Sequence, residues 1–125
     1  MIEGLPKNFR TYENDKYGHL RLVDIPAEIR VNAPWFNQTL TTVNDAVVRL
    51  GIFEGDFPWH KHVEQDEFFL VLDGEIVLDL EGREPLRLGV HEGLTVPKNV
   101  MHRPRSPKRS VVLMVESAGI VPTGD

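Results

Sequence analysis

Three histidines and one glutamate occur at spacings that suit a metal ion. His60 and His62 are separated by one residue, Glu67 follows five positions later, and His102 lies further along the chain. Imidazole and carboxylate groups together bind Fe(II), Mn(II), Ni(II), Cu(II) and Zn(II). The chain has no cysteine, which excludes thiolate ligands, thiolate nucleophiles and disulfides. We therefore expect a divalent metal site and leave open which of these metals it takes.

The spacing of the four residues predicts the elements that hold them. On a strand, residues i and i+2 face one side with Cα atoms roughly 6 to 7 Å apart, so His60 and His62 can converge on one ion if residues 59–63 are extended. Glu67 lies five residues after His62, so on one straight strand it would face the opposite side. The polar residues 64–66 must therefore reverse the chain before it. His102 must come from a distant strand, which a turn at residues 97–99 introduces.

Short apolar runs between glycines and prolines predict an all-β fold. We expect strands at residues 19–23, 46–53, 59–63, 67–72, 75–80, 85–88, 94–96 and 111–116, enough for a small closed antiparallel barrel. Asp73 and Gly74 are typical of a two-residue hairpin turn, and Glu81 and Gly82 are expected to close the next hairpin.

The length of 125 residues corresponds to one domain. Residues 1–40 are expected to form an N-terminal arm packed on the barrel, with a helical turn at residues 24–30. Residues 41–118 are expected to form the barrel, and residues 119–125 a C-terminal tail.

Charge and hydropathy exclude several classes of protein. The net charge is −5, the wrong sign for binding a phosphate backbone, so no nucleic-acid partner is expected. No apolar run approaches the roughly 18 residues of a membrane span, and none forms a signal-peptide core, so we expect a cytoplasmic protein without a membrane partner. Serine-hydrolase and nucleotide-binding motifs are absent from the sequence.

The alternation of side chains between the two faces of the strand that begins at Glu67 predicts which residues line the pocket. Phe69 and Val71 share the parity of Glu67 and are expected to line a substrate-binding pocket. The alternate residues of this strand are also apolar: Phe68, Leu70 and Leu72. A strand with two apolar faces is buried on both, so the arm or a second subunit must cover the outer face, and we predict a homodimer.

Cationic residues leave two interpretations open. Arg49 lies within an apolar strand and either faces the pocket, as a candidate substrate-binding residue, or lies at a strand edge. Residues 103–109 contain four cations. They form either a solvated loop or a patch that attracts an anionic substrate to the mouth of the barrel.

The first histidine segment resembles a motif of the cupin superfamily. That motif is written G-x5-H-x-H-x3,4-E-x6-G, and the chain matches it, with four residues instead of five after the first glycine, at Gly55, His60, His62, Glu67 and Gly74.

A second segment resembles the partner motif, G-x5-P-x-G-x2-H-x3-N. Pro97 and His102 match it, whereas Asn99 replaces the inner glycine, Gly93 lies closer to the proline, and Ser106 stands in place of the asparagine. These differences alter turns and leave the ligands in place. Residues 117–124 also resemble the end of small bacterial cupins described as similar to mannose-6-phosphate isomerase.

The resemblance implies a cupin jelly roll, covering residues 45–118, with metal ligands His60, His62, Glu67 and His102. It does not fix the reaction, because cupin sites support many chemistries. Four ligands leave about two positions open on a six-coordinate ion. The chemistry expected is that of a dioxygenase or an isomerase acting on a small polar molecule. The alternative is a non-catalytic module that binds a sugar or organic acid. An isomerase needs a base that is not a ligand, and the sequence identifies none.

Overall fold

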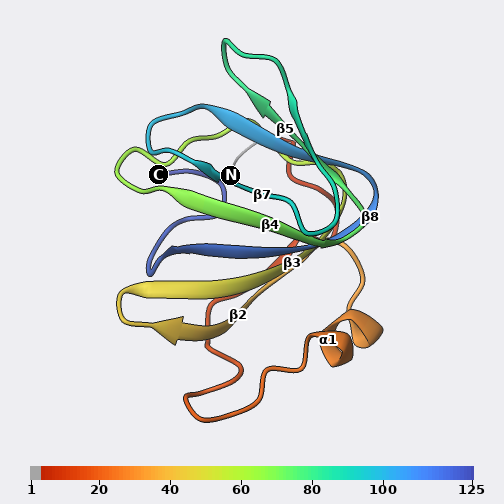
Figure 1. Ribbon diagram of the computed structural model, residues 1–125, viewed down its shortest axis with the longest axis vertical. Coiled ribbons are helices and arrows are strands. Elements are labelled where there is room, and N and C mark those ends of the chain that lie inside the picture. Colours follow the sequence, from red (N-terminus) through yellow and green to blue (C-terminus); the bar gives the residue numbers. More distant parts are fainter. Residues whose placement is uncertain (1–3) are drawn as a thin grey trace.

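Short apolar runs and glycine-containing turns build a molecule whose regular secondary structure consists almost entirely of strands (Figure 1). The computed structural model describes residues 4–125. Within them it contains β1 (Arg10–Tyr12), α1 (Ile25–Val31), β2 (Phe36–Val43), β3 (Ala46–Asp56), β4 (Glu67–Asp73), β5 (Ile76–Leu80), β6 (Leu86–Leu88), β7 (Gly93–Val96) and β8 (His102–Ser117).

The longest strand, β8, joins two parts of the sheet. Its first residues pair with β5, whereas residues 110–117 pair with β3 on one edge and 111–116 with β4 on the other. The pairing order is β1-β2-β3-β8-β4-β7, and β5 also pairs with β6. The all-β jelly-roll fold is confirmed. The closed barrel was wrong, because among residues 4–125 no strand pairing joins β1 to β7.

Two predicted strands are absent from the described structure, and two strands were missed. Residues 19–23 lie in an irregular segment where Leu20 has φ 64° and is fully exposed. Residues 59–63 form no strand, and only an isolated bridge at His60. The missed strands are β1, which lies within the stretch expected to be an arm, and β2, whose first five residues lie there. The polar residues of β2 include Asn37 and Thr39, both buried, and this polarity hid the strand from an apolar pattern.

The turn at Gly74 connects two strands that do not pair with each other. Both β4 and β5 pair with β8, so the chain turns a corner here and forms no hairpin, contrary to the prediction. Gly74 has φ 79°, and a Cβ at this position would lie 2.4 Å from Ser110 Oγ. Glycine is therefore needed both for the conformation and for the close approach. The hairpin at Gly82 is confirmed, because β5 and β6 pair antiparallel across it.

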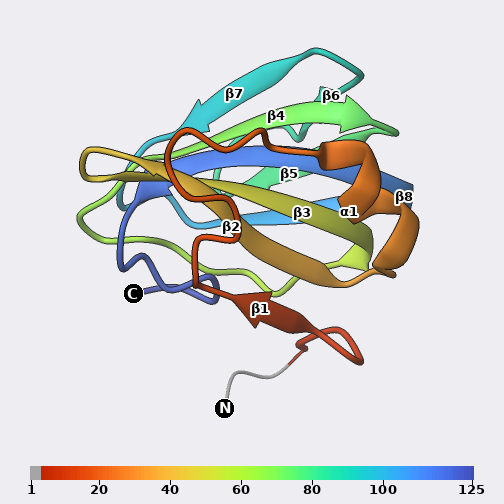
Figure 2. The ribbon, with the colours of Figure 1, turned by 90° about the horizontal axis from the view of Figure 1, so that it is seen from below.

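Strands β3 and β8 are buried on both faces. Their inward residues join the core between the layers, which includes Phe53 and Met114. Their outward residues join a second cluster, against which Ile25 and Ile29 of α1 pack. The helix lies outside the sheet (Figure 2), and no helix in the described part of the chain is long and apolar enough to cross a membrane.

Candidate metal centre

Backbone pairing brings the two histidine segments together. His60 and His102 form an antiparallel bridge in which each N–H donates to the other residue's carbonyl, at 2.9 and 2.8 Å. His102 is the first residue of β8, and Glu67 is the first residue of β4. The chain bends at Val63 and Glu64, within the segment where a reversal was expected between His62 and Glu67. Lys61 is exposed between two buried histidines, so the predicted alternation holds even without a strand.

The two loops next to the candidate ligands are hydrogen-bonded to each other. The backbone N–H of Asn99 donates to the carbonyl of His62 at 2.7 Å, and that of Lys98 donates to Asp66 Oδ1 at 2.8 Å. Asn99 has φ 65°, the left-handed conformation that asparagine tolerates and that the inner glycine of the motif would adopt. The turn at residues 97–99 thus positions both His102 and the loop after His62.

The four side chains form one buried group that can hold a metal ion. Each offers a ligand atom, and these atoms all lie within 4.8 Å of one another: His60, His62, Glu67 and His102. Glu67 Oε1 lies 3.5 Å from Nε2 of His62 and 3.5 Å from Nε2 of His102. All four are at least nine-tenths buried.

Each imidazole is oriented through its Nδ1 atom. His60 Nδ1–H donates to the carbonyl of Pro58 and His102 Nδ1–H to that of Val100, both at 2.8 Å. His62 instead donates to the carboxylate of Asp125, also at 2.8 Å. A hydrogen bond at Nδ1 fixes the tautomer that leaves Nε2 with a free lone pair, which is how metal-binding histidines are held.

Unpartnered buried atoms support the fit to a metal. His62 Nε2, His102 Nε2 and Glu67 Oε1 have no hydrogen-bond partner, although they are buried. Buried polar atoms are almost always paired, and an ion shared by these three atoms would pair them all. The set of three nitrogens and one oxygen suits Fe(II), Mn(II), Ni(II), Cu(II) or Zn(II).

Burial and mutual contacts set the protonation of the group. Burial lowers the pKa of His60 to about 4, so its imidazole is neutral at pH 7. For His62, burial acts to lower the pKa, but the close contact with Glu67 and the charge of its carboxylate outweigh burial and raise the pKa. Burial acts to raise the pKa of Glu67, but its close contacts with Glu116, His102 and His62 hold that pKa well below its ordinary value.

A second carboxyl group, Glu116, lies directly across the ladder from Glu67. The two are register partners on β8 and β4. Burial and the neighbouring Glu67 raise the pKa of Glu116 to about 10, so it keeps its proton. Its Oε1 lies 3.5 Å from Arg49 Nη1, and its Oε2 has no partner. The sequence analysis missed Glu116, although an acid at inward parity in the run 111–116 was a usable signal.

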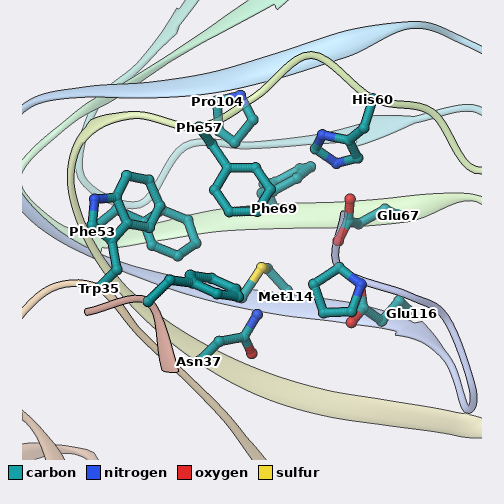
Figure 3. A pocket seen from close by; sticks show the side chains of 12 residues that line it. Trp35, Asn37, Phe53, Phe57, His60, Glu67, Phe69, Pro104, Met114 and Glu116 are labelled. Atoms are coloured by element: carbon teal, nitrogen blue, oxygen red, sulfur yellow. The ribbon is translucent and has the colours of Figure 1, made fainter. Parts of the chain in front are cut away.

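A cavity opens beside the candidate ligands, and aromatic rings form much of its wall (Figure 3). Its free volume is about 30 Å³, room for one or two water-sized molecules. Its lining comprises Phe9, Trp35, Asn37, Phe53, Phe57, His60, Glu67, Phe69, Pro104, Met114, Glu116 and Pro122. Asn37 and Glu116 are the two polar residues of this lining outside the ligand group.

The structure places the predicted pocket residues differently. Phe69 lines the cavity, whereas Val71 faces the same interior deeper in the core and lies outside the lining. Arg49 is buried on the inward face and contacts Asn37 and Glu116, just behind the cavity wall.

The cations of residues 103–109 lie on β8, so the predicted loop was wrong. Arg103 and Arg105 both bind Asp79 of β5. Arg109 donates to the carbonyls of Ile29 and Asn32 at the end of α1. These three side chains are engaged by the protein itself, which argues against the second interpretation, an anion-attracting patch.

Comparison with known proteins gives a consistent result. A family model described as a cupin domain matches residues 46–116. The chain is 42% identical over 80 residues to an uncharacterized Bacillus subtilis protein, YdbB, covering 64% of this chain and 71% of that protein. A cupin-2 domain protein from Shewanella frigidimarina superposes with a TM-score of 0.72 at 25% identity, covering 77% of this chain and 94% of that chain.

A larger enzyme also contains a similar fold. Hydroquinone 1,2-dioxygenase from Sphingomonas, solved with 4-hydroxybenzoate bound, superposes with a TM-score of 0.65 at 25% identity. The match covers 72% of this chain but only 29% of the dioxygenase chain.

Proposed function

The chain belongs to the cupin domain family, and from that premise we propose that it is a small metalloenzyme of the dioxygenase type. The observation that carries the proposal is the buried group of three imidazoles and one carboxylate, which opens onto a cavity walled largely by aromatic rings. A divalent ion held there supplies Lewis-acid chemistry and, if it is iron, redox chemistry toward O2. Binding of the substrate and transfer of protons are left to side chains of the protein.

The cavity wall favours a substrate with an apolar body. Rings such as Trp35 and Phe53, which stack with centroids 4.7 Å apart, exclude water and offer flat apolar surfaces. A sugar needs many hydrogen-bond partners, and besides the candidate ligands the side chains of this lining offer only Asn37, Glu116 and the indole N–H of Trp35. A small ring compound with oxygen substituents fits better, and the similarity to hydroquinone 1,2-dioxygenase supports this class.

An isomerase is the second candidate because of Glu116. Isomerisation of a hydroxy carbonyl compound needs a proton-transferring group that does not bind the metal. Glu116 lines the cavity beside Glu67 and carries its proton on a buried carboxyl group. Glu116 would therefore act as a proton donor, which differs from the unprotonated base that the sequence analysis sought.

A binding module is the third candidate because the cavity is small. The free volume of about 30 Å³ holds no ring compound. Entry of such a substrate requires Phe9 and Pro122, which lie outside the strands, to move. A protein that keeps this cavity closed would bind only small ligands.

Metal analysis followed by oxygen uptake tests the proposal. Untagged protein is expected to contain a near-stoichiometric metal by mass spectrometry, and the iron-loaded form is expected to consume O2 with small dihydroxybenzenes. A His62→Ala variant, which lacks one candidate ligand, serves as the control and should do neither. Metal uptake with isomerisation of a hydroxy ketone and no O2 consumption would favour the isomerase. Failure to take up any metal would overturn the metalloenzyme proposal.

A further inference from the structure

Arg49 fixes the direction of a buried amide. Its Nε donates to Asn37 Oδ1 at 2.9 Å, and the side chains are almost fully buried, with 2% and 6% of their surfaces exposed. A guanidinium group has donors only, so it must meet the amide oxygen and turn the Asn37 Nδ2 group away. Figure 3 shows that nitrogen directed into the cavity.

The guanidinium group is itself held by two further elements. Arg49 Nη2 donates to Thr11 Oγ1 of β1 at 2.9 Å, and Nη1 lies 3.5 Å from Glu116 Oε1 of β8. Asn37 lies on β2 and pairs in register with Gly51 of β3. Since β1, β2, β3 and β8 together hold this arrangement, the amide is a preorganised donor.

The amide nitrogen has no partner within the described residues. The Asn37 side chain lines the cavity, and its only hydrogen bond there is the one to Arg49. An amide N–H that faces a cavity and has no acceptor in the protein leaves one hydrogen bond for a bound ligand to complete. In Figure 3, Asn37 lies across the cavity from His60, with Met114 between them.

We infer that Asn37 determines specificity by donating a hydrogen bond to an acceptor oxygen at the end of the substrate remote from the candidate metal ligands. The inference rests on the proposed function and narrows it. The substrate would be a ring compound with oxygen at both ends, bound at one end by the metal centre and at the other by Asn37. A ring with an apolar group at the second end would leave the amide unpaired and bind more weakly.

Calorimetric titration of the manganese-loaded protein tests this. The probes are 4-hydroxybenzaldehyde, with an acceptor at the second end, and 4-methylphenol, with an apolar group of similar size. The wild type is expected to bind the aldehyde about tenfold more tightly, as one hydrogen bond at a buried site implies. The Asn37→Leu variant should lose this preference, because it has no amide N–H to donate to the aldehyde oxygen.

A matched control lies two residues along the same strand. Thr39 is equally buried but lies outside the cavity lining, so Thr39→Val should keep the preference for the aldehyde. Equal binding of the two probes by metal-loaded wild type, or binding of neither, would overturn the inference while leaving the metal centre standing. An unaltered preference in Asn37→Leu would overturn it too. Metal content is measured first, because a protein without metal overturns the proposed function itself.

Discussion

The three imidazoles of the candidate site use their two nitrogens for different purposes. Each Nδ1 is engaged by a hydrogen bond, and each Nε2 belongs to the group that can share an ion. A metal ion binds an unprotonated ring nitrogen, so each histidine must be neutral and must keep its proton on the other nitrogen. The hydrogen bonds at Nδ1 meet this requirement. This use of the two nitrogens also separates these residues from His19, whose Nε2 is taken up by Thr42 at the surface.

Removing His102 should abolish metal binding. His102→Ala deletes a buried ligand atom from the group, so metal content by mass spectrometry should fall from near-stoichiometric to background. The control is His19→Ala, which removes an exposed histidine and should retain the metal. Equal metal content in the two variants would place the site elsewhere.

The stability of the metal-free protein should depend on pH in the way that the lowered pKa of His60 implies. This pKa is about 4 in the fold and 6.5 as the ordinary value, so the unfolded chain binds more protons between these values. The stability that a neutral His60 contributes is present above pH 6.5 and is lost as the pH falls to 4, by about 3 kcal/mol.

A comparison with His60→Gln isolates this contribution. The raised pKa of His62 acts in the opposite sense but is shared by both proteins. The difference in unfolding free energy between wild type and variant, measured by urea denaturation in chelator, should therefore change between pH 7 and pH 4. Parallel pH curves would contradict the assignment.

At the scale of elements, the C-terminal tail contacts the candidate metal site in a way that the sequence analysis did not predict. Asp125 accepts from His62 Nδ1, and its N–H donates to the carbonyl of Lys61 at 3.1 Å. The other two histidines take their partners from carbonyls two residues earlier. His62 thus depends on a contact made 63 residues away, and Pro122 of the same tail lies at the cavity.

Replacing Asp125 should weaken the metal site without removing a ligand. Asp125→Ala is expected to lower metal affinity by 10- to 100-fold, the usual effect of losing a partner of a metal-binding histidine. Asp125→Asn retains an acceptor oxygen and should lose less. Competition with a fluorescent chelator measures both, and Asp15→Ala, which removes an exposed carboxylate, is the control. Unchanged affinity in Asp125→Ala would show that His62 needs no such support.

The arginines of β8 should matter for stability and little for the site. Asp79 is 7% exposed and is held by Arg103 and Arg105. Arg105→Ala leaves this buried carboxylate short of a partner, and we expect a loss of about 2 kcal/mol in urea denaturation. Lys108→Ala removes an exposed cation from the same strand and should cost nothing measurable. A changed ligand affinity in Arg105→Ala at unchanged stability would restore the anion-attracting interpretation.

Short apolar runs between turns predicted most strands, including β4 and β5. The spacing of the histidines, together with the resemblance to the cupin motifs, predicted the candidate ligands, including His102. Contacts between distant segments were not predictable in this way. Asn37 lies on a strand of polar residues that pair only within the folded sheet, and nothing near Asp125 in the sequence indicates its contact with His62.

At the scale of the whole molecule, apolar surface remains at the outer face. The outward residues of β4 are only partly covered, since Phe68 and Leu70 stay half-buried beside the cluster that α1 covers. Leu22 and Val31 are 94% and 75% exposed. Apolar surface of this kind often marks a contact between protein chains.

The homodimer therefore stays a prediction with a direct measurement. Light scattering coupled to size exclusion should give twice the chain mass of 14.2 kDa. A mass of one chain at micromolar concentration would contradict it and would leave the arm as the only cover of β4.

The contact between Asp125 and His62 has a thermodynamic corollary. Two binding events that share a free energy of coupling must influence each other by the same factor. If the docked tail tightens metal binding tenfold, the bound metal must shift the docking equilibrium of the tail tenfold toward the docked form. Amide hydrogen exchange at Asp125, whose N–H is engaged only when the tail is docked, would then slow in proportion as the metal is loaded. The tail would report on the occupancy of the centre that it supports.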